Sequence, residues 1–258
     1  MDTLLPGMPP SLTRVVERAL RERGVGVRLS SKALGLDGDD LVVEGPAGEE
    51  RLPADVVIVA VGRRPNTDGL GLEQAGVRLD GDGLVVVDPA RKAARNVYAI
   101  GDVTAGPALA HKATAEAEVA AVGATGQPAV FDPATVPAVV FSDPELATVG
   151  LTAEQASAAG AEATSFTFPL AASGRALTLG RRDGHVELAA DGDGTVLGVH
   201  MVGPGVAELA FGAALAVEMA ATVEDVAATI APHPTLSEAL AEAAKAAAGH
   251  PLHIRRPT

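Results

Sequence analysis

The sequence predicts an α/β region followed by an α+β region that contains an antiparallel sheet. The α/β prediction comes from residues 55–61, a continuous apolar run typical of a strand buried on both faces of a helix-covered parallel sheet. The α+β prediction comes from the order of the later elements, in which a group of strands precedes a group of helices. A polar, proline-marked stretch over 126–135 separates the two regions.

The first region begins with a helix over 11–23, because apolar residues such as Leu12 and Val16 recur at helical spacing and Gly24 ends the pattern. An alanine-rich helix over 109–123 has small residues on many faces, so it can pack closely against a neighbour or a ligand. Strands are expected over 25–29, 41–44, 55–61, 81–88 and 96–100.

In the second region, alternating and apolar runs predict strands over 136–141, 147–150, 165–170, 185–190 and 196–202. Helices are expected over 152–159, 206–220, 223–229 and 235–248. Thr152 should cap the first of these helices, with Gln155 behind it. The polar tail over 250–258 is expected to be a loose arm.

The composition of the 258 residues limits the classes of function. Hydrophobic residues make up 47% of the chain, which argues against disorder, and a net charge of −13 disfavours binding to nucleic acid or an anionic membrane. No apolar run is long enough to span a bilayer and no signal pattern opens the chain, so we expect a cytoplasmic protein without membrane contact. The absence of cysteine excludes disulfides, thiolate metal sites and cysteine nucleophiles from this chain, and we predict no metal site.

The first candidate for chemistry is the pair His233 and Glu238 near the start of the last predicted helix. A carboxylate that accepts from one ring nitrogen fixes the tautomer of a histidine and raises the basicity of the other nitrogen. The same glutamate fits a capping box in which Thr235 is the N-cap residue. A single carboxylate does not easily serve both roles, so these residues by themselves leave both interpretations open.

A second candidate lies where the strand over 96–100 stops at Gly101 and Asp102. A glycine at a strand end permits close approach of a ligand, and an aspartate there can accept hydrogen bonds from sugar hydroxyls. The helix that begins near Leu109 presents free N–H groups and positive potential at its start. Gly-Asp is also common in ordinary turns, and for the dipeptide alone we favour that interpretation.

Other polar residues nearby have plain interpretations when taken alone. Arg63 and Arg64 fit a turn with two solvated arginines after Gly62. His111 fits a surface or capping histidine.

Five motifs nevertheless follow one another in a fixed order: VGRRPN at 61–66, NVYAIGDV at 96–103, LAHKA at 109–113, SDPELATVG at 142–150 and HPTLSEA at 233–239. This series resembles the pyridine nucleotide-disulfide oxidoreductases. The form LSEA at 236–239 is most similar to the dihydrolipoamide dehydrogenase branch of that family. The resemblance covers essentially the whole chain.

The resemblance implies a role for each motif. His233 would be the acid–base catalyst that faces a reactive thiol across a homodimer interface, and Glu238 would orient it. Asp102 would hold the ribityl chain of FAD, and backbone groups at the helix start would contact the flavin ring. Gly62 would lie beside NAD. The implied cofactor-binding residues are Gly62, Gly101, Asp102, Ala108, Leu109, Ala110 and His111.

The resemblance also implies a domain order. Residues 1–65 would be the C-terminal part of a Rossmann-like NAD-binding domain, and residues 66–134 the C-terminal part of the FAD-binding and central domain. Residues 135–258 would be the interface, or dimerisation, domain. We expect this last domain to fold well and dimerise. We expect the apolar edge of the strand over 55–61 to be exposed or paired with another segment.

The chain departs from the family in three features. Complete members carry a GxGxxG loop for FAD, a CxxxxC redox pair and a second GxGxxG loop for NAD, and this sequence has none of them. Without a dithiol no electron pair can pass from dihydrolipoamide to flavin, and without phosphate-binding turns FAD and NAD bind weakly. We therefore expect the C-terminal half of such an enzyme, inactive alone.

Two biological roles fit that expectation. The chain could be the C-terminal part of such an enzyme, either truncated or complementing a separately encoded N-terminal half and, with it, acting on a lipoyl-bearing protein. Alternatively, it could be a non-catalytic dimerisation and interaction module derived from the family.

Overall fold

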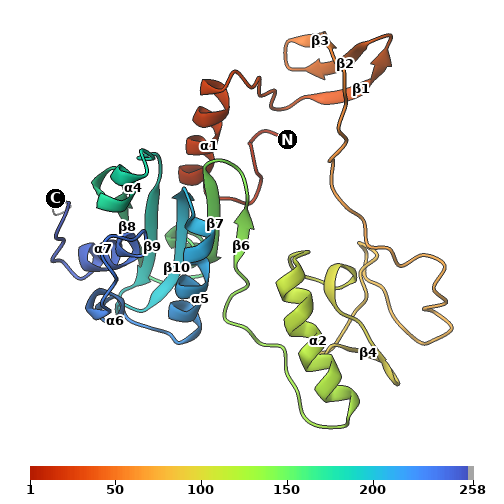
Figure 1. The fold of residues 1–258 in the computed structure, drawn as a ribbon. Helices are drawn as coiled ribbons and strands as arrows, with labels where there is room; N and C mark the ends of the chain where they lie inside the picture. The colour runs from red at the N-terminus through yellow and green to blue at the C-terminus, as the bar shows by residue number, and fades with distance from the viewer. Residues whose placement is uncertain (255–258) are drawn as a thin grey trace. The chain divides into compact units, whose positions relative to one another are not determined.

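The computed structural model describes residues 1–254, which fold as two compact units (Figure 1). One unit joins residues 1–58 to the chain from residue 137 onward, and the other consists of residues 59–136. Each unit has its own secondary structure and its own candidate site, so the two are described separately.

The first unit is built on a five-stranded sheet in which every neighbouring pair is antiparallel, in the order β6-β7-β10-β9-β8. In this sheet His200 lies opposite Thr148 on one neighbouring strand and opposite Glu187 on the other. The antiparallel prediction for this region is therefore confirmed. The strands are β6 (Ala138–Val140), β7 (Glu145–Gly150), β8 (Ala163–Pro169), β9 (His185–Asp191) and β10 (Val196–Gly203).

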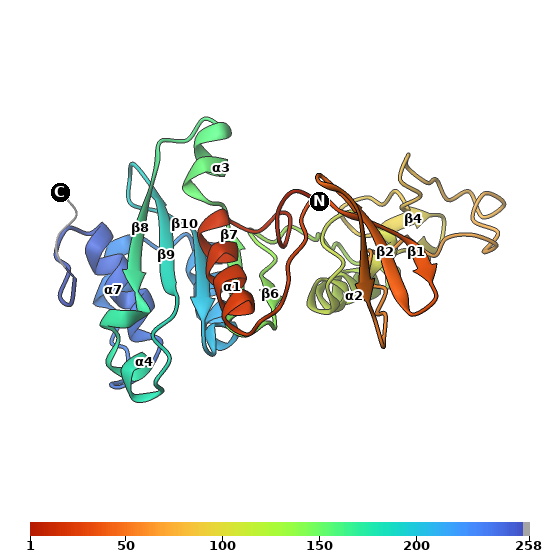
Figure 2. The ribbon, with the colours of Figure 1, turned by 90° about the horizontal axis from the view of Figure 1, so that it is seen from above.

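Helices cover both faces of this sheet (Figures 1 and 2). Successive residues of a strand point to opposite faces, and on β10 Met201 joins the larger core while Val202 joins a second, smaller one. The smaller core also contains Leu12 and Val16 of the N-terminal helix. The covering helices are α1 (Pro10–Glu22) on that face and α5 (Ala210–Glu218), α6 (Val223–Ala228) and α7 (Glu238–Ala247) on the other.

Short elements complete this unit. The helix α3 (Ala153–Ala158) begins with the predicted capping box, in which Thr152 and Gln155 each bond the backbone N–H of the other. The predicted helix over 206–220 is divided into a 3-10 turn, η3 (Val206–Leu209), and α5. The sequence did not predict η2 (Leu170–Ala172) or α4 (Gly174–Thr178).

A separate three-stranded antiparallel sheet is formed by β1 (Lys32–Asp37), β2 (Asp40–Gly45) and β3 (Gly48–Pro53). Its central strand confirms the strand predicted over 41–44. The strand predicted over 25–29 is wrong, because the sheet is completed by β1 to β3 and residues 25–29 pair with none of them.

The unit of residues 59–136 contains one long helix, α2 (Ala110–Ala124), as predicted from its alanine-rich sequence. The other regular elements are β4 (Lys92–Ala94), β5 (Val97–Tyr98) and the 3-10 turn η1 (Gly101–Val103). The strand predicted over 81–88 is wrong. It is reduced to isolated bridges from Val85 to Leu79 and to Thr104.

The buried strand predicted over 55–61 is also wrong. These residues lie outside any strand, and Val56, Ile58 and Val61 are 78%, 86% and 90% exposed. A strand buried on both faces needs paired neighbours and helices above and below it, and the described residues provide neither for this run. The exposure expected for this run is observed, although the run forms no strand and so has no strand edge.

The described part of the tail, residues 250–254, is not the loose arm that we expected. The backbone N–H of His253 and its Nδ1 both lie 3.1 Å from Oε2 of Glu242, a side chain of α7 that is almost fully buried. Residues 255–258 lie outside the described part of the chain. Among the described residues, no helix combines the length and the hydropathy needed to cross a membrane.

Candidate functional site

The carboxylate of Glu238 binds two partners at the start of α7. Its Oε1 lies 2.9 Å from Nδ1 of His233, and its Oε2 accepts the backbone N–H of Thr235 at 2.9 Å. Each oxygen takes one partner, so one carboxylate makes both the contact to the histidine and the backbone contact expected of a capping box. The pair predicted from the sequence is thus brought together.

The capping box is only half formed. The hydroxyl of Thr235 donates to the carbonyl of Pro232 at 2.7 Å and caps no helix N–H. The N-cap residue of α7 is Ser237, which makes no side-chain cap hydrogen bond. Thr235 is therefore not the N-cap, and Glu238 at the first helical position fixes both the preceding loop and the histidine.

Exposure separates the two members of this pair. The side chain of His233 is 77% exposed, whereas that of Glu238 is 27% exposed. Burial works to raise the pKa of Glu238, but the hydrogen bonds from His233 and from the Thr235 backbone lower it below its ordinary value. The carboxylate is therefore ionised at neutral pH and favours a proton on Nδ1, which leaves Nε2 for another partner.

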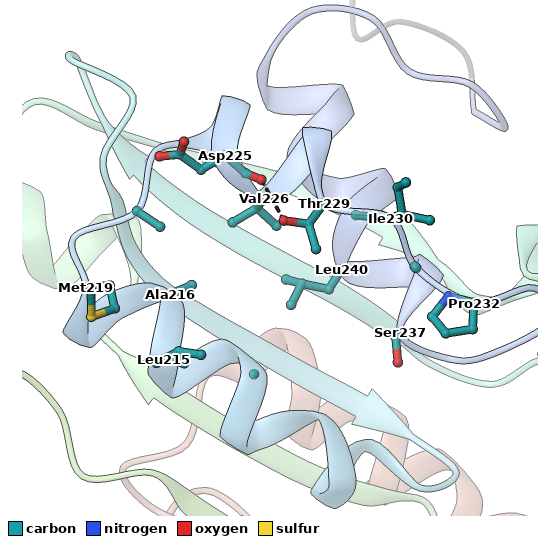
Figure 3. Close-up of a pocket in the computed structure, with 14 residues that line it drawn as sticks. Leu215, Ala216, Met219, Asp225, Val226, Thr229, Ile230, Pro232, Ser237 and Leu240 are labelled. Carbon is teal, nitrogen blue, oxygen red and sulfur yellow. Dashed lines mark hydrogen bonds between the residues drawn. The ribbon is translucent and has the colours of Figure 1, made fainter.

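An apolar groove with a volume of about 390 Å³ lies beside this pair (Figure 3). Pro232 and Ser237 line it at the end near His233, and Leu215 of α5 and the C-cap residue Met219 line it at the other. Ile230 at its rim is 94% exposed. The sequence analysis did not single out this groove, although the apolar spacing on α5 is visible in the sequence.

In the unit of residues 59–136, the structure brings Asp102 together with Arg63. Asp102 lies in the turn η1, and its side chain is 49% exposed. Nη1 of Arg63 donates to Oδ2 of Asp102 at 2.7 Å, and Nη2 donates to the carbonyl of Ala108 at 2.8 Å. Arg63 is solvated as expected, with a side chain that is 68% exposed, but its guanidinium also bridges two of the predicted cofactor residues.

These residues surround a cavity with a volume of about 520 Å³, lined by Arg63, Arg64, Pro65, Asp82, Leu84, Asp102, Thr104, Gly106 and Ala108. The cavity combines two cations, two carboxylates and an apolar wall. Such a combination suits a ligand that carries both polar groups and an apolar part.

The other predicted contacts lie close to this cavity in the sequence but do not line it. Leu109 is the N-cap residue of α2 and gives the helix no side-chain cap, and Ala110 and His111 form its first turn. Gly62 precedes the lining residues and has a φ of +120°, which favours glycine.

The residues present fit a flavin better than a nicotinamide dinucleotide. For the flavin, the chain provides the half-exposed carboxylate of Asp102, a cavity and the start of α2. The N-cap side chain of α2, that of Leu109, accepts no hydrogen bond from the first N–H groups of the helix. Gly101 adds a close approach of backbone to helix, because a Cβ there would lie 3.2 Å from that of Ala113. For the dinucleotide there is only Gly62, and one glycine does not make a phosphate-binding turn.

Comparison with known protein families identifies the family of this chain. The pyridine nucleotide-disulphide oxidoreductase profile matches residues 1–117, and the dimerisation domain of the same family matches residues 136–244. The chain belongs to this family. Its fold is accordingly the family's mixed α/β fold, with Rossmann-like and dimerisation domains.

Relatives within this oxidoreductase family include dihydrolipoyl dehydrogenases. The chain is 46% identical to one from Halobacterium salinarum and 43% identical to one from Bacillus subtilis, and each alignment covers 98% of this chain and 55% of the relative. This protein therefore spans about half the length of the curated relatives it matches.

Solved structures give the same relationship. LpdA from Mycobacterium tuberculosis matches with a TM-score of 0.85 and 31% identity, over 95% of this chain and 54% of LpdA. The flavoprotein disulfide reductase RclA from Escherichia coli matches with a TM-score of 0.81 and 26% identity, over 92% of this chain and 55% of RclA.

Proposed function

We propose that this chain supplies the acid–base pair of a dihydrolipoamide dehydrogenase-like flavin disulfide oxidoreductase. The observation that carries the proposal is the 2.9 Å contact between His233 Nδ1 and Glu238 Oε1. It occurs in a chain that is 46% identical to a dihydrolipoyl dehydrogenase. Glu238 holds the proton on Nδ1, so Nε2 accepts a proton from a thiol, and the carboxylate then stabilises the imidazolium.

FAD is the cofactor that we propose for the cavity of the 59–136 unit. Asp102 would accept hydrogen bonds from the ribityl hydroxyls, and Gly101 would let the chain approach closely. The backbone from Ala108 to His111 would face the flavin ring at the start of α2, where the helix dipole is positive. When bound, FAD would carry the electron pair between a dithiol and a nicotinamide.

NAD is the second cofactor that we propose, and Gly62 is the residue proposed to lie beside it. The sequence has no GxGxxG loop, so this chain lacks a turn that could cradle the pyrophosphate. We derive no step through the nicotinamide from these residues.

A second copy of this chain is the partner that we propose for the groove beside His233. Phe211 and Leu215 of α5 and its C-cap residue Met219 follow one another at four-residue spacing and are 79%, 52% and 69% exposed. Such a stripe of exposed apolar side chains is typical of an interaction surface. It lies within residues 136–244, which match the family's dimerisation domain.

The residues of this chain contain no cysteine, so they do not themselves supply the redox dithiol. We propose that a separately encoded N-terminal half supplies the dithiol and the phosphate loops, and that a lipoyl-bearing protein is the substrate. Residues 1–65 and 66–134 would then be the C-terminal parts of the NAD-binding and FAD-binding domains, and residues 135–258 the interface domain. Alone, the chain would be catalytically incompetent.

The exposed groove favours one alternative, a non-catalytic dimerisation and interaction module. The two functions differ in what they require of His233. A half-enzyme needs this histidine and a cysteine-bearing partner, whereas a module needs neither.

Complementation tests this choice. The chain would be co-expressed with the part of the Bacillus subtilis relative that this chain does not cover, and dihydrolipoamide-dependent NAD reduction would be measured. We expect activity from the mixture, none from either part, and loss with His233→Ala but not with the exposed-site control His250→Ala. An inactive mixture that nevertheless forms a stable complex would favour the module.

The visible absorbance spectrum with excess FAD is a separate check on the cofactor. A flavin spectrum that stays with the purified chain would mean that the contacts around Asp102 suffice for binding. A colourless chain would agree with the missing phosphate loop.

A further inference from the structure

Glu116 is a charged residue buried in the unit of residues 59–136. Its side chain is 0% exposed, and Lys112, one turn earlier on α2, is 2% exposed. Burying charged groups is costly unless they are paired and fully hydrogen-bonded, and replacing a buried ion pair by apolar residues is often neutral or stabilising. Fold stability alone therefore does not account for this pair.

The carboxylate is shared between the turn η1 and two cations. Its Oε2 accepts the backbone N–H of Gly101 at 2.6 Å. Its Oε1 lies 3.0 Å from Nζ of Lys112 and 3.4 Å from Nη2 of Arg91. A hydrogen bond to an ionised acceptor is roughly twice as strong as a neutral one.

The same cluster holds the other side of the turn. Nζ of Lys112 donates to the hydroxyl of Thr104 at 3.1 Å, and that hydroxyl donates to the carbonyl of Gly101 at 2.9 Å. Both backbone polar groups of Gly101 are therefore fixed. Asp102 follows directly in the turn, with its carboxylate half exposed and paired with Arg63.

We propose that Glu116 is a positioning residue. Its buried carboxylate, held by Lys112 and Arg91, fixes the turn η1 so that the Asp102 carboxylate is presented at the cavity. The value of this placement for FAD rests on the proposed function. The placement itself can be measured without a flavin.

The test is Glu116→Gln, which keeps the shape of the side chain and removes its charge, with Glu118→Gln as the matched control. Glu118 lies on the same helix but is exposed. Amide hydrogen exchange and ¹⁵N relaxation would be measured on both. We expect E116Q to speed exchange at Gly101 roughly tenfold or more and to increase fast motion at Asp102 and Val103.

The rest of the unit defines what would overturn the proposal. Amides in the second half of α2, such as that of Ala120, should keep their exchange rates in E116Q, and E118Q should change nothing. Unchanged exchange at Gly101 would overturn the proposal. An equal rise across the whole unit would also overturn it, because Glu116 would then be structural only.

If E116Q does not fold, Thr104→Val is the second variant that tests the positioning role. It removes only the hydroxyl that bonds Lys112 and the Gly101 carbonyl, and it keeps the side-chain volume. Faster exchange confined to residues 101–103 supports the proposal, and no change there overturns it.

A flavin measurement then separates this proposal from the proposed function. Binding of FAD to wild type and to E116Q would be followed by quenching of flavin fluorescence, and we expect E116Q to bind more weakly. If wild type binds no FAD while the turn loosens in E116Q, the cofactor proposal fails and the positioning role stands. If wild type binds FAD and E116Q binds it equally well, the positioning role fails.

Discussion

Oε1 of Glu238 lies 2.9 Å from Nδ1 of His233, at the point where α7 begins. The other oxygen of the same carboxylate holds the backbone of Thr235, so the loop and the ring are fixed by one side chain. A histidine that is 77% exposed would otherwise sample several rotamers. The glutamate therefore orders a group that must remain accessible.

Replacing Glu238 by alanine should change the tautomer of His233. With the carboxylate present, the proton lies on Nδ1; without it, nothing in this contact favours that nitrogen. The ¹⁵N shifts of the ring, recorded above the ordinary histidine pKa, should show protonated Nδ1 in wild type and a shift toward protonated Nε2 in E238A. The free energy of unfolding should also fall by about 1 kcal/mol, since Thr235 N–H loses its acceptor.

The exposed glutamate at position 208 gives the control, because Glu208→Ala removes the same atoms from the short turn η3 of the same unit. E208A should leave the ring of His233 unchanged. An E238A ring with the wild-type tautomer would mean that Glu238 does not orient the histidine.

His200 should make the stability of the sheet depend on pH. The residue is 1% exposed, and within the described chain neither ring nitrogen has a hydrogen-bond partner. Burial lowers the pKa of His200 below the ordinary 6.5, and the nearby backbone of Leu151 and the charge of Glu187 offset only part of this effect. Below pH 6.5 the unfolded chain then binds more protons than the folded chain, so the free energy of unfolding falls as the pH falls.

Leucine at position 200 should reduce this dependence, because it fills a similar volume without a titratable ring. Urea unfolding between about pH 5 and pH 7 should show a smaller slope in His200→Leu, by at most about 1.4 kcal/mol per pH unit. Part of the slope should remain, because burial also lowers the pKa of His185. His250→Leu, at an exposed site, should keep the wild-type slope, and an unchanged slope in H200L would contradict the assignment.

Local patterns predicted the elements that depend on local contacts. The capping box at Thr152 and the helix over 109–123 are set by residues within a few positions, and both formed where expected. The run over 55–61 is different, because a strand buried on both faces exists only where other strands and helices surround it. Nothing in its apolar sequence indicates that the described chain lacks these neighbouring strands and helices.

The polar sites show the same limit. Arg63 and Asp102 are 39 positions apart, so nothing in the turn sequence indicates that the arginine is paired. In the sequence, Glu116 and Lys112 have the spacing of an ordinary pair on an exposed helix face. Their burial, and the bond from Gly101 to Glu116, arise only when the turn packs on α2.

Gly184 should tolerate no side chain. Its φ is +117°, and a Cβ at this position would lie 1.8 Å from the carbonyl oxygen of Val202 on β10. Gly184→Ala must displace that strand, so we expect the free energy of unfolding to fall by about 3 kcal/mol or more. Urea unfolding followed by circular dichroism measures this loss.

Gly160 provides the matched comparison. Its φ is +91°, but a Cβ at this position would have no heavy atom of another residue within 4 Å, apart from its chain neighbours. Gly160→Ala should therefore cost only the left-handed backbone penalty, about 1–2 kcal/mol. Equal losses in the two variants would show that the contact with Val202 adds nothing.

The stripe on α5 should control self-association. Leu215 lines the groove beside His233 and is 52% exposed, so in a dimer its side chain would be covered by the second copy. Leu215→Glu places a charge in that apolar contact, and we expect the dissociation constant from sedimentation equilibrium to rise roughly 100-fold or more.

Leu70→Glu is the control for this prediction, because Leu70 is 65% exposed and belongs to the other unit. It should leave association unchanged, and circular dichroism should show both variants folded. A wild-type chain that is monomeric at all concentrations would contradict the proposed second copy as partner. A dimer that both variants leave intact would mean that the copies meet through another surface. The groove would then be free for a different chain, as the interaction-module alternative requires.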